Sequence, residues 1–164
     1  MNLAYLIGPI TGLTAGEAQD WRTDPWFTTA LRALGWKPLS PFDGLGFYPE
    51  QKYDKDAVLD SWFEDEHLGK NAAAKAVWKD LFFIDSAKVA IANLSGAERA
   101  SIGSVSEITY CFSTQTPVIT VLDKEGVHDH PFVCELSTFV VPTLEDAVDQ
   151  LRLLTKQMKE PQYA

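Results

Sequence analysis

The segment SIGSVSEI, residues 101–108, contains a single carboxylate, Glu107, four residues after Gly103. A carboxylate in a ligand-facing turn can act as the nucleophile of covalent catalysis. The same segment places Ser104 and Glu107 in the S-x-x-E spacing of a capping box, whose two side chains bond backbone N–H groups at a helix start. The local pattern therefore leaves two roles open for Glu107, a structural cap and a catalytic group.

Two further polar clusters invite a chemical interpretation. His128 and His130 flank Asp129, but two histidines at i, i+2 without another His or Cys cluster form a weak ligand set, so we predict no metal site. Trp21 and Arg22 could stack on a base or hold a phosphate, although a surface aromatic–cation pair is the favoured interpretation.

The composition is that of one soluble globular domain. The chain has 164 residues, 46% of them hydrophobic and 23% charged, which supports a sizeable core and excludes disorder. No repeat, low-complexity block or linker divides the sequence, so we predict a single domain over residues 1–164.

The charge and the cysteines limit the partners and the compartment. The net charge is −9 and no Lys/Arg cluster could neutralise a nucleic-acid backbone, which argues against polymeric nucleic acid as a partner. Any phosphate would be held locally, by backbone N–H groups and hydroxyls. Cys111 and Cys134 lie in apolar segments and are predicted to be free thiols. We find no secretory signal and no apolar run long enough to span a membrane, so a cytoplasmic protein is expected.

Alternating strand and helix patterns run along the chain. Strands are predicted at 3–7, 36–41, 88–94, 116–122 and 139–141. Helices are predicted from Asp24 to Gly35, over 70–86, from the SIGSVSEI segment, over 130–137, and from a Thr143 cap to the C-terminal region. Residues 8–16 and 41–51 are expected to be loops, and 54–68 has a weak helical pattern.

These helices need apolar faces to pack on the strands. The first predicted helix carries Trp26, Phe27, Ala30, Leu31 and Leu34, and the 70–86 helix carries Ala73, Val77, Leu81 and Ile84. Continuous apolar strands between such helices favour a parallel sheet covered on both faces, an α/β three-layer sandwich. Ligands of such sheets bind at the carboxyl ends of the strands, where the loops GPITG and SGAERASIGS would lie with Glu107.

Three segments together resemble the nucleoside 2-deoxyribosyltransferase-like family, namely YLIGPITG, KDLFFIDSAKVAIANL and SIGSVSEITYCFSTQTPVITV. That family includes nucleoside 2-deoxyribosyltransferases and deoxynucleoside 5′-monophosphate N-glycosidases. The resemblance covers roughly residues 3–140 and implies a flavodoxin-like fold with about five parallel strands, a homodimer or higher homo-oligomer, and no metal or organic cofactor.

The resemblance also implies roles for individual residues. Glu107 would be the nucleophile, Asp80 would position the leaving base and help to protonate it, and Tyr5 would support the nucleophile. The predicted substrate-binding residues are Gly8, Pro9, Ile10, Thr11, Asp43, Ser101, Gly103, Ser104 and His130.

Ser101 separates the two activities of the family. The transferases typically carry an aspartate six residues before the nucleophile, where it contacts the sugar 5′-hydroxyl, whereas the monophosphate glycosidases carry a serine. A serine hydroxyl beside the N–H groups of a helix start would accept a 5′-phosphate that an aspartate would repel. The glycosidases also use a serine from a neighbouring subunit, and His130 stands at the matching position here.

We therefore expect an enzyme that cleaves the N-glycosidic bond of a small (2′-deoxy)nucleoside 5′-monophosphate. A helix N-terminus close to Glu107 would favour its ionised, nucleophilic form. Base exchange by a nucleoside 2′-deoxyribosyltransferase is the alternative, and a non-catalytic nucleotide-binding module is a further one.

Overall fold

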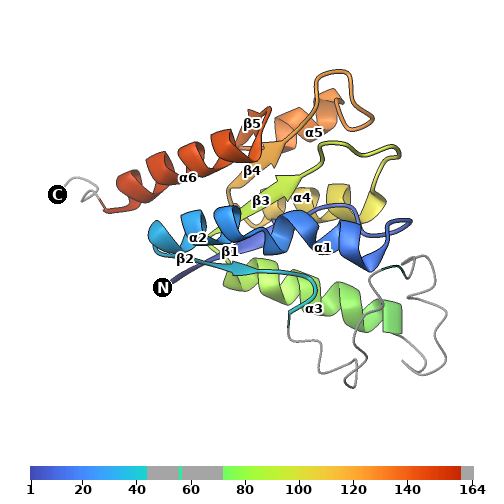
Figure 1. The fold of residues 1–164 in the computed structure, drawn as a ribbon, viewed down its shortest axis with the longest axis horizontal. Helices are drawn as coiled ribbons and strands as arrows, with labels where there is room; N and C mark the ends of the chain where they lie inside the picture. The colour runs from blue at the N-terminus through green and yellow to red at the C-terminus, as the bar shows by residue number, and fades with distance from the viewer. Residues whose placement is uncertain (44–55, 57–71, 160–164) are drawn as a thin grey trace.

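Five parallel strands form the centre of the molecule in the order β2-β1-β3-β4-β5 (Figure 1). The computed structural model describes residues 1–43, 56 and 72–159. The strands are β1 (Asn2–Ile7), β2 (Trp36–Leu39), β3 (Val89–Asn93), β4 (Val118–Val121) and β5 (Phe139–Val141). The predicted flavodoxin-like α/β sandwich with a five-stranded parallel sheet is thereby confirmed.

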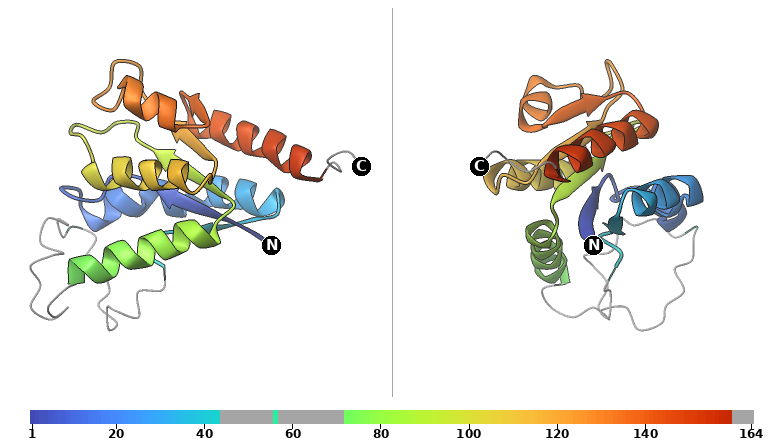
Figure 2. Two further views of the ribbon diagram at one scale, coloured as in Figure 1. Left: turned by 180° about the vertical axis from the view of Figure 1, so that it is seen from behind. Right: turned by 90° about the vertical axis from the view of Figure 1, so that its left-hand side faces the viewer.

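Helices cover both faces of this sheet, as Figure 2 shows edge-on. The helices are α1 (Ala15–Thr23), α2 (Pro25–Ala33), α3 (Ala72–Ser86), α4 (Ile102–Ser113), α5 (Pro131–Leu136) and α6 (Leu144–Lys159). Side chains of α2 and α6 pack with Ala4 and Leu6 of β1 on one face, and side chains of α3, α4 and α5 pack with Tyr5 and Ile7 on the other. The period-2 alternation along β1 thus feeds two separate cores.

The termini of α2 and α6 follow the predicted caps. The Asp24 carboxylate accepts from the N–H of Phe27 at 2.9 Å, and the chain leaves α2 through Gly35 at φ +89°. The Thr143 hydroxyl accepts from the N–H of Asp146 at 3.1 Å at the start of α6. The predicted apolar faces are partly wrong, because Trp26 of α2 and Val77 of α3 are each at least half exposed.

Helix α1 was not predicted, since the segment after the first strand was interpreted as a long loop. Thr14 is its N-cap and forms a complete capping box with Glu17, in which each residue bonds a backbone N–H of the other. The loop expected at 8–16 therefore ends at Thr14 and is followed directly by a helix.

Two predictions fall largely outside the described residues. Of the loop expected at 41–51 only residues 41–43 are described, and of the weak helix at 54–68 only residue 56. Among the described helices, none is both long and apolar enough to cross a membrane.

Candidate active site

A cavity of about 1180 Å³ opens at the carboxyl ends of β1 and β3. These neighbouring strands lead into loops that run in opposite directions over the sheet, which is where ligands bind in folds of this topology. The predicted site residues Gly8, Pro9, Ile10, Thr11, Asp80, Ser101, Gly103, Ser104 and Glu107 all line this cavity. The fold thus gathers residues that lie up to a hundred positions apart in the sequence.

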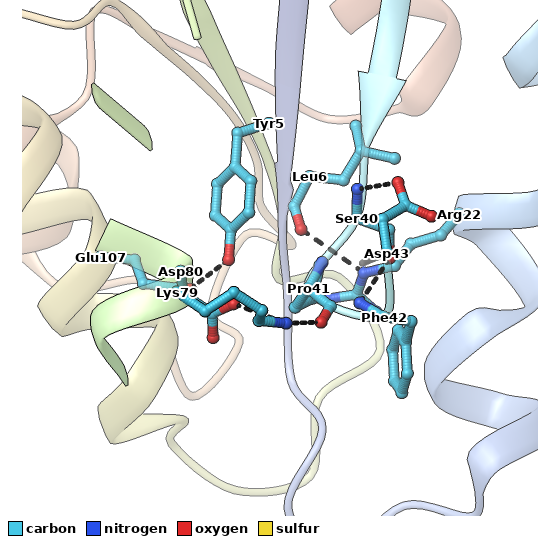
Figure 3. Close-up of polar contacts among 10 residues, drawn as sticks. All are labelled: Tyr5, Leu6, Arg22, Ser40, Pro41, Phe42, Asp43, Lys79, Asp80 and Glu107. Carbon is cyan, nitrogen blue, oxygen red and sulfur yellow. Dashed lines mark hydrogen bonds and ion pairs between the residues drawn. The ribbon is translucent and has the colours of Figure 1, made fainter. Parts of the chain in front are cut away.

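Glu107 enters the cavity from the second turn of α4 and is not part of a capping box. Ser101 is the N-cap of α4, and its hydroxyl oxygen accepts from the N–H of Ser104 at 3.3 Å. Glu107 instead accepts a 2.7 Å hydrogen bond from the phenolic hydroxyl of Tyr5 on β1 (Figure 3). The capping interpretation of Ser104 and Glu107 is therefore wrong, and the carboxylate is held by the sheet.

Asp80 lies on α3 and is the second acid of the site. Its Oδ1 lies 3.1 Å from the Nζ of Lys79, and the side chains of both residues are largely buried. Lys79 also donates to the carbonyl oxygen of Pro41, which ties α3 to the turn after β2 (Figure 3). Asp80 is thereby directed toward the cavity beside a fixed positive charge.

Burial raises the affinity of both carboxyl groups for protons. Burial and the charge of Asp80 raise the pKa of Glu107 to about 7, against the opposing effects of the Tyr5 hydrogen bond, Arg22 and Lys79. Burial likewise raises the pKa of Asp80, which the Lys79 ammonium opposes. The expected stabilisation of ionised Glu107 by the helix N-terminus is wrong, since that effect fades beyond the first turn and burial outweighs it.

Arg22 is buried behind the site, and the surface position predicted for it is wrong. It is 3% exposed, and its guanidinium donates to the carbonyl oxygens of Leu6 at 3.5 Å, Gly8 at 2.9 Å and Ala18. Burial lowers its pKa to about 10, so it remains charged at neutral pH. A Cβ on Gly8 would lie only 2.9 Å from Nη2 of Arg22, which is why the loop after β1 requires glycine there.

The N-terminus of α4 presents unused hydrogen-bond donors to the cavity. The backbone N–H groups of Ile102 and Gly103 have no hydrogen-bond partner among the described residues. Arg99, exposed on the preceding loop, reaches across to the carbonyl oxygen of Gly12 at 3.5 Å and forms no ion pair with a described residue. This part of the cavity can accept an anion.

Two predicted residues lie outside this cavity. The Asp43 carboxylate accepts from the N–H of Ser40 at 2.8 Å and closes its own turn, and Asp43 is not among the described cavity residues. His130 is exposed as the N-cap of α5, where its Nδ1 accepts from the N–H of Phe132. Within the described ranges, no group of three or more His, Cys, Asp or Glu residues is arranged to hold a metal ion.

His128 and Arg99 reach this site without having been predicted. The Nε2 of buried His128 accepts from the backbone N–H of Ser101 at 2.8 Å. No local pattern distinguishes His128 from His130, so only the path of the loop could identify the one that faces Ser101. Arg99 could have been found as a cation inside the loop already assigned to the functional edge.

No protein-family model and no curated protein matches the chain in sequence. Among solved structures, a 2-deoxyribosyltransferase from the bacterium Bacillus psychrosaccharolyticus superposes with a TM-score of 0.58 at 13% identity over 90% of both chains. A conserved protein from Enterococcus faecalis V583 gives a TM-score of 0.57 at 16% identity over 96% of this chain and 99% of that one. The chain therefore has a nucleoside 2-deoxyribosyltransferase-like fold.

Proposed function

We propose that the protein hydrolyses the N-glycosidic bond of a (2′-deoxy)nucleoside 5′-monophosphate to the free base and the sugar phosphate. The observation that carries this proposal is the 2.7 Å hydrogen bond from buried Tyr5 to Glu107, which lines the cavity together with Asp80. Most enzymes that hydrolyse glycosidic bonds use two carboxyl groups in one active site.

Glu107 acts as the nucleophile in this mechanism. Its carboxylate attacks C1′ of the sugar, a C1′–O bond forms and the C1′–N bond breaks, so the bonding electrons leave with the base. Tyr5 fixes the attacking group by donating to Oε1. A water molecule then attacks C1′ and gives its proton to the Asp80 carboxylate while the C1′–O bond to Glu107 breaks, which returns the Glu107 carboxylate and the Asp80 acid and releases the sugar phosphate.

Asp80 supplies the proton that the departing base requires. Burial raises its pKa above the ordinary value of an aspartate, and the neighbouring Lys79 stabilises the carboxylate left after the transfer. The charge of Asp80 raises the pKa of Glu107, so the two groups are coupled, and we assign the active form to the state in which the pair holds one proton. The reactive state has ionised Glu107 and protonated Asp80.

The phosphate preference rests on the start of α4. Ser101 stands where the transferases of the resembling family carry an aspartate, and two free N–H groups follow it. A 5′-phosphate at this position would meet the helix dipole, the Ser101 and Ser104 hydroxyls and the exposed guanidinium of Arg99. These groups favour a nucleotide over an unphosphorylated nucleoside.

Base exchange by a 2′-deoxyribosyltransferase is a second candidate function. It is supported by the fold shared with the 2-deoxyribosyltransferase of Bacillus psychrosaccharolyticus. The same glycosyl ester would then be attacked by a second base in place of water. A nucleotide-binding module that lacks turnover is the third candidate.

One assay separates these candidates. The protein is incubated with 2′-deoxynucleoside and ribonucleoside 5′-monophosphates and with the matching nucleosides, with and without a free acceptor base, and the products are separated by liquid chromatography. Free base plus sugar phosphate is the expected result. A new nucleoside formed only with the acceptor would establish the transferase instead, and binding without any cleavage would leave the non-catalytic module.

We also propose that a second copy of the chain completes the phosphate site. His130 is exposed at the N-cap of α5 and is not among the described cavity residues, so its side chain is accessible to a neighbouring molecule, as the family resemblance implies. Light scattering is expected to give a dimer or larger homo-oligomer in the cytoplasmic pH range. A strict monomer that retains full activity would remove the role of His130.

A further inference from the structure

His128 is a buried histidine that contacts the start of α4 through a single well-formed bond. It is 2% exposed, and its Nε2 accepts from the backbone N–H of Ser101 at 2.8 Å. A ring nitrogen that accepts must be unprotonated, so the neutral ring carries its proton on Nδ1. Burial lowers the pKa of His128, against the opposing effect of the Leu94 backbone, and so favours the neutral ring in which Nε2 accepts.

This bond helps to tie the β4–α5 loop to the β3–α4 loop. A further bond joins the N–H of Gly96 to Oδ2 of Asp123 at 2.5 Å. The two bonds hold both ends of the segment 96–101, and this whole segment lines the cavity. The position of the cavity wall therefore depends on a loop that lies behind it.

The His128 bond acts on the residue that begins α4. Ser101 has φ −92° and ψ 103°, and its hydroxyl oxygen lies 2.9 Å from the hydroxyl oxygen of Ser104. A shift of the Ser101 backbone would move this hydroxyl together with the free N–H groups of Ile102 and Gly103. Since displacements of about 1 Å in a binding constellation can cost about 100-fold in rate, an anchor at this position matters.

We propose that His128 is a positioning residue for phosphate recognition, which it serves by fixing the backbone of Ser101 from behind the cavity wall. The inference rests on the proposed function, because it assumes that Ser101 faces the 5′-phosphate. His128 itself touches no substrate. His128 is two residues before the predicted His130, but His128 accepts from the N–H of Ser101 whereas His130 accepts from the N–H of Phe132.

Three variants test this role in a Glu107→Gln background, where ligand is bound without turnover. His128→Leu removes the acceptor, His128→Gln offers Oε1 at nearly the same place as Nε2, and Val127→Ala alters the exposed neighbour only. Calorimetry measures the dissociation constants of the four 2′-deoxynucleoside 5′-monophosphates and of the matching nucleosides. Amide hydrogen exchange at Ser101 reports the bond itself.

His128→Leu is expected to weaken monophosphate binding about tenfold, with nucleoside binding changed less than twofold and faster exchange of the Ser101 amide. His128→Gln should recover most of the affinity, and Val127→Ala should match the parent. Thermal unfolding of each variant confirms that the folded fraction is the same at the assay temperature. If His128→Leu does not fold, His128→Gln and the exchange rate still decide the question.

Equal weakening for monophosphates and nucleosides would overturn the inference, as would unchanged affinity together with an exposed Ser101 amide. Absence of any monophosphate binding by the Glu107→Gln parent would overturn it as well. Failure of the proposed function has a different signature, because the unaltered protein would then release no base while the binding pattern above still held.

Discussion

Residues 14–17 and 104–107 carry the same pattern, a hydroxyl residue followed three positions later by glutamate, yet the two glutamates do opposite things. Glu17 completes the capping box of α1, and its hydrogen bonds with the N–H and hydroxyl of Thr14 lower its pKa. Glu107 caps nothing, lies against Tyr5, and has a pKa raised to about 7. The Glu17 carboxylate is exposed to solvent and accepts hydrogen bonds from Thr14, whereas the Glu107 carboxylate is buried away from solvent.

The difference arises from what lies in front of each helix. Thr14 opens α1 at the surface, where solvent and two local hydrogen bonds satisfy Glu17. Helix α4 opens three residues earlier than the pattern suggests, at Ser101, which turns Glu107 inward against β1 and α3. The pattern therefore identifies a cap only when the helix start is known independently.

The largest expected effect comes from removing the charge of each glutamate in turn. Glu107→Gln retains an acceptor for Tyr5 but no nucleophile, and should lower the rate of base release by at least about 10³-fold. Glu17 also lines the cavity, but Glu17→Gln can still complete the capping box with Thr14 and removes no proposed reacting group, so its rate should stay within about threefold. Chromatographic release of free base from 2′-deoxynucleoside 5′-monophosphates measures both.

Equal losses of activity in the two variants would contradict the different roles assigned to Glu107 and Glu17. Full base release by Glu107→Gln would contradict the nucleophile assignment. Circular dichroism of both variants, recorded under assay conditions, separates a chemical loss from a loss of folded protein.

The next largest effect concerns Asp80, the acid whose charge raises the pKa of Glu107. Glu107 is faced by Asp80 and Lys79 from α3, Tyr5 from β1 and Arg22 from α1, and Asp80 is the charge that raises its pKa. Asp80→Asn should lower the rate about 10²-fold by removing the proton donor. It should also move the rising limb of the pH–rate profile below about pH 7, since Glu107 then ionises more easily.

The measurement is kcat/KM from pH 5 to pH 9 for the unaltered protein and Asp80→Asn. A rising limb that stays near pH 7 in the variant would mean that Asp80 does not interact with Glu107. Asp85→Asn, on the same helix but bonded to the Tyr110 hydroxyl, is the matched control and should leave the position of the limb unchanged.

Much of the fold was predictable because strands and helices in this chain carry strong local signals. The β3 and β4 segments consist mostly of apolar and β-branched residues, and Asp24, Pro25 and Gly35 mark the two ends of α2. Helix α1 escaped prediction because its interior is polar and contains a glycine, so that only the Thr14 capping box announces it. Periodicity identifies helices through their buried face, and α1 buries little.

The candidate site was predictable only where the family resemblance supplied it. Tyr5, Asp80 and Glu107 come from three separated segments, and nothing in their local sequences shows that they meet. Arg22 was misplaced at the surface because three backbone carbonyl groups, which no sequence pattern reveals, satisfy it in the interior. Pairings of this kind depend on the register of the sheet and on loop paths.

A smaller effect concerns how the ionisation of Glu107 changes the stability of the folded protein with pH. The folded-state pKa of Glu107, about 7, exceeds its value of 4.5 in the unfolded chain, so the native state holds a proton that the unfolded state has lost. The stability of the unaltered protein should therefore fall as pH rises from about 4.5 to 7. Relative to it, Glu107→Gln should gain on the order of 1–3 kcal/mol at pH 8 and little at pH 4.5.

Urea unfolding at both pH values gives this difference. A gain that is the same at pH 4.5 and pH 8 would indicate a packing effect of the amide and not the removal of a desolvated charge. The raised pKa of Asp80 contributes a slope of the same sign to both proteins, so only the difference between them is informative.

The smallest effect concerns Glu17 and should have the opposite dependence on pH. Its pKa is lowered in the folded protein, so its ionised form stabilises the native state above the unfolded pKa, and this contribution is lost as pH falls through the folded pKa. Glu17→Ala removes both hydrogen bonds with Thr14 and should be less stable than the unaltered protein at pH 7. The stabilities of Glu17→Ala and the unaltered protein should become equal in acid. The stability difference of Glu107→Gln also vanishes there, but at higher pH that variant is the more stable protein, whereas Glu17→Ala is the less stable one. Thermal unfolding from pH 3 to pH 8 measures both trends in one series, and a Glu17→Ala deficit that grows in acid would contradict the capping role that separates the two glutamates.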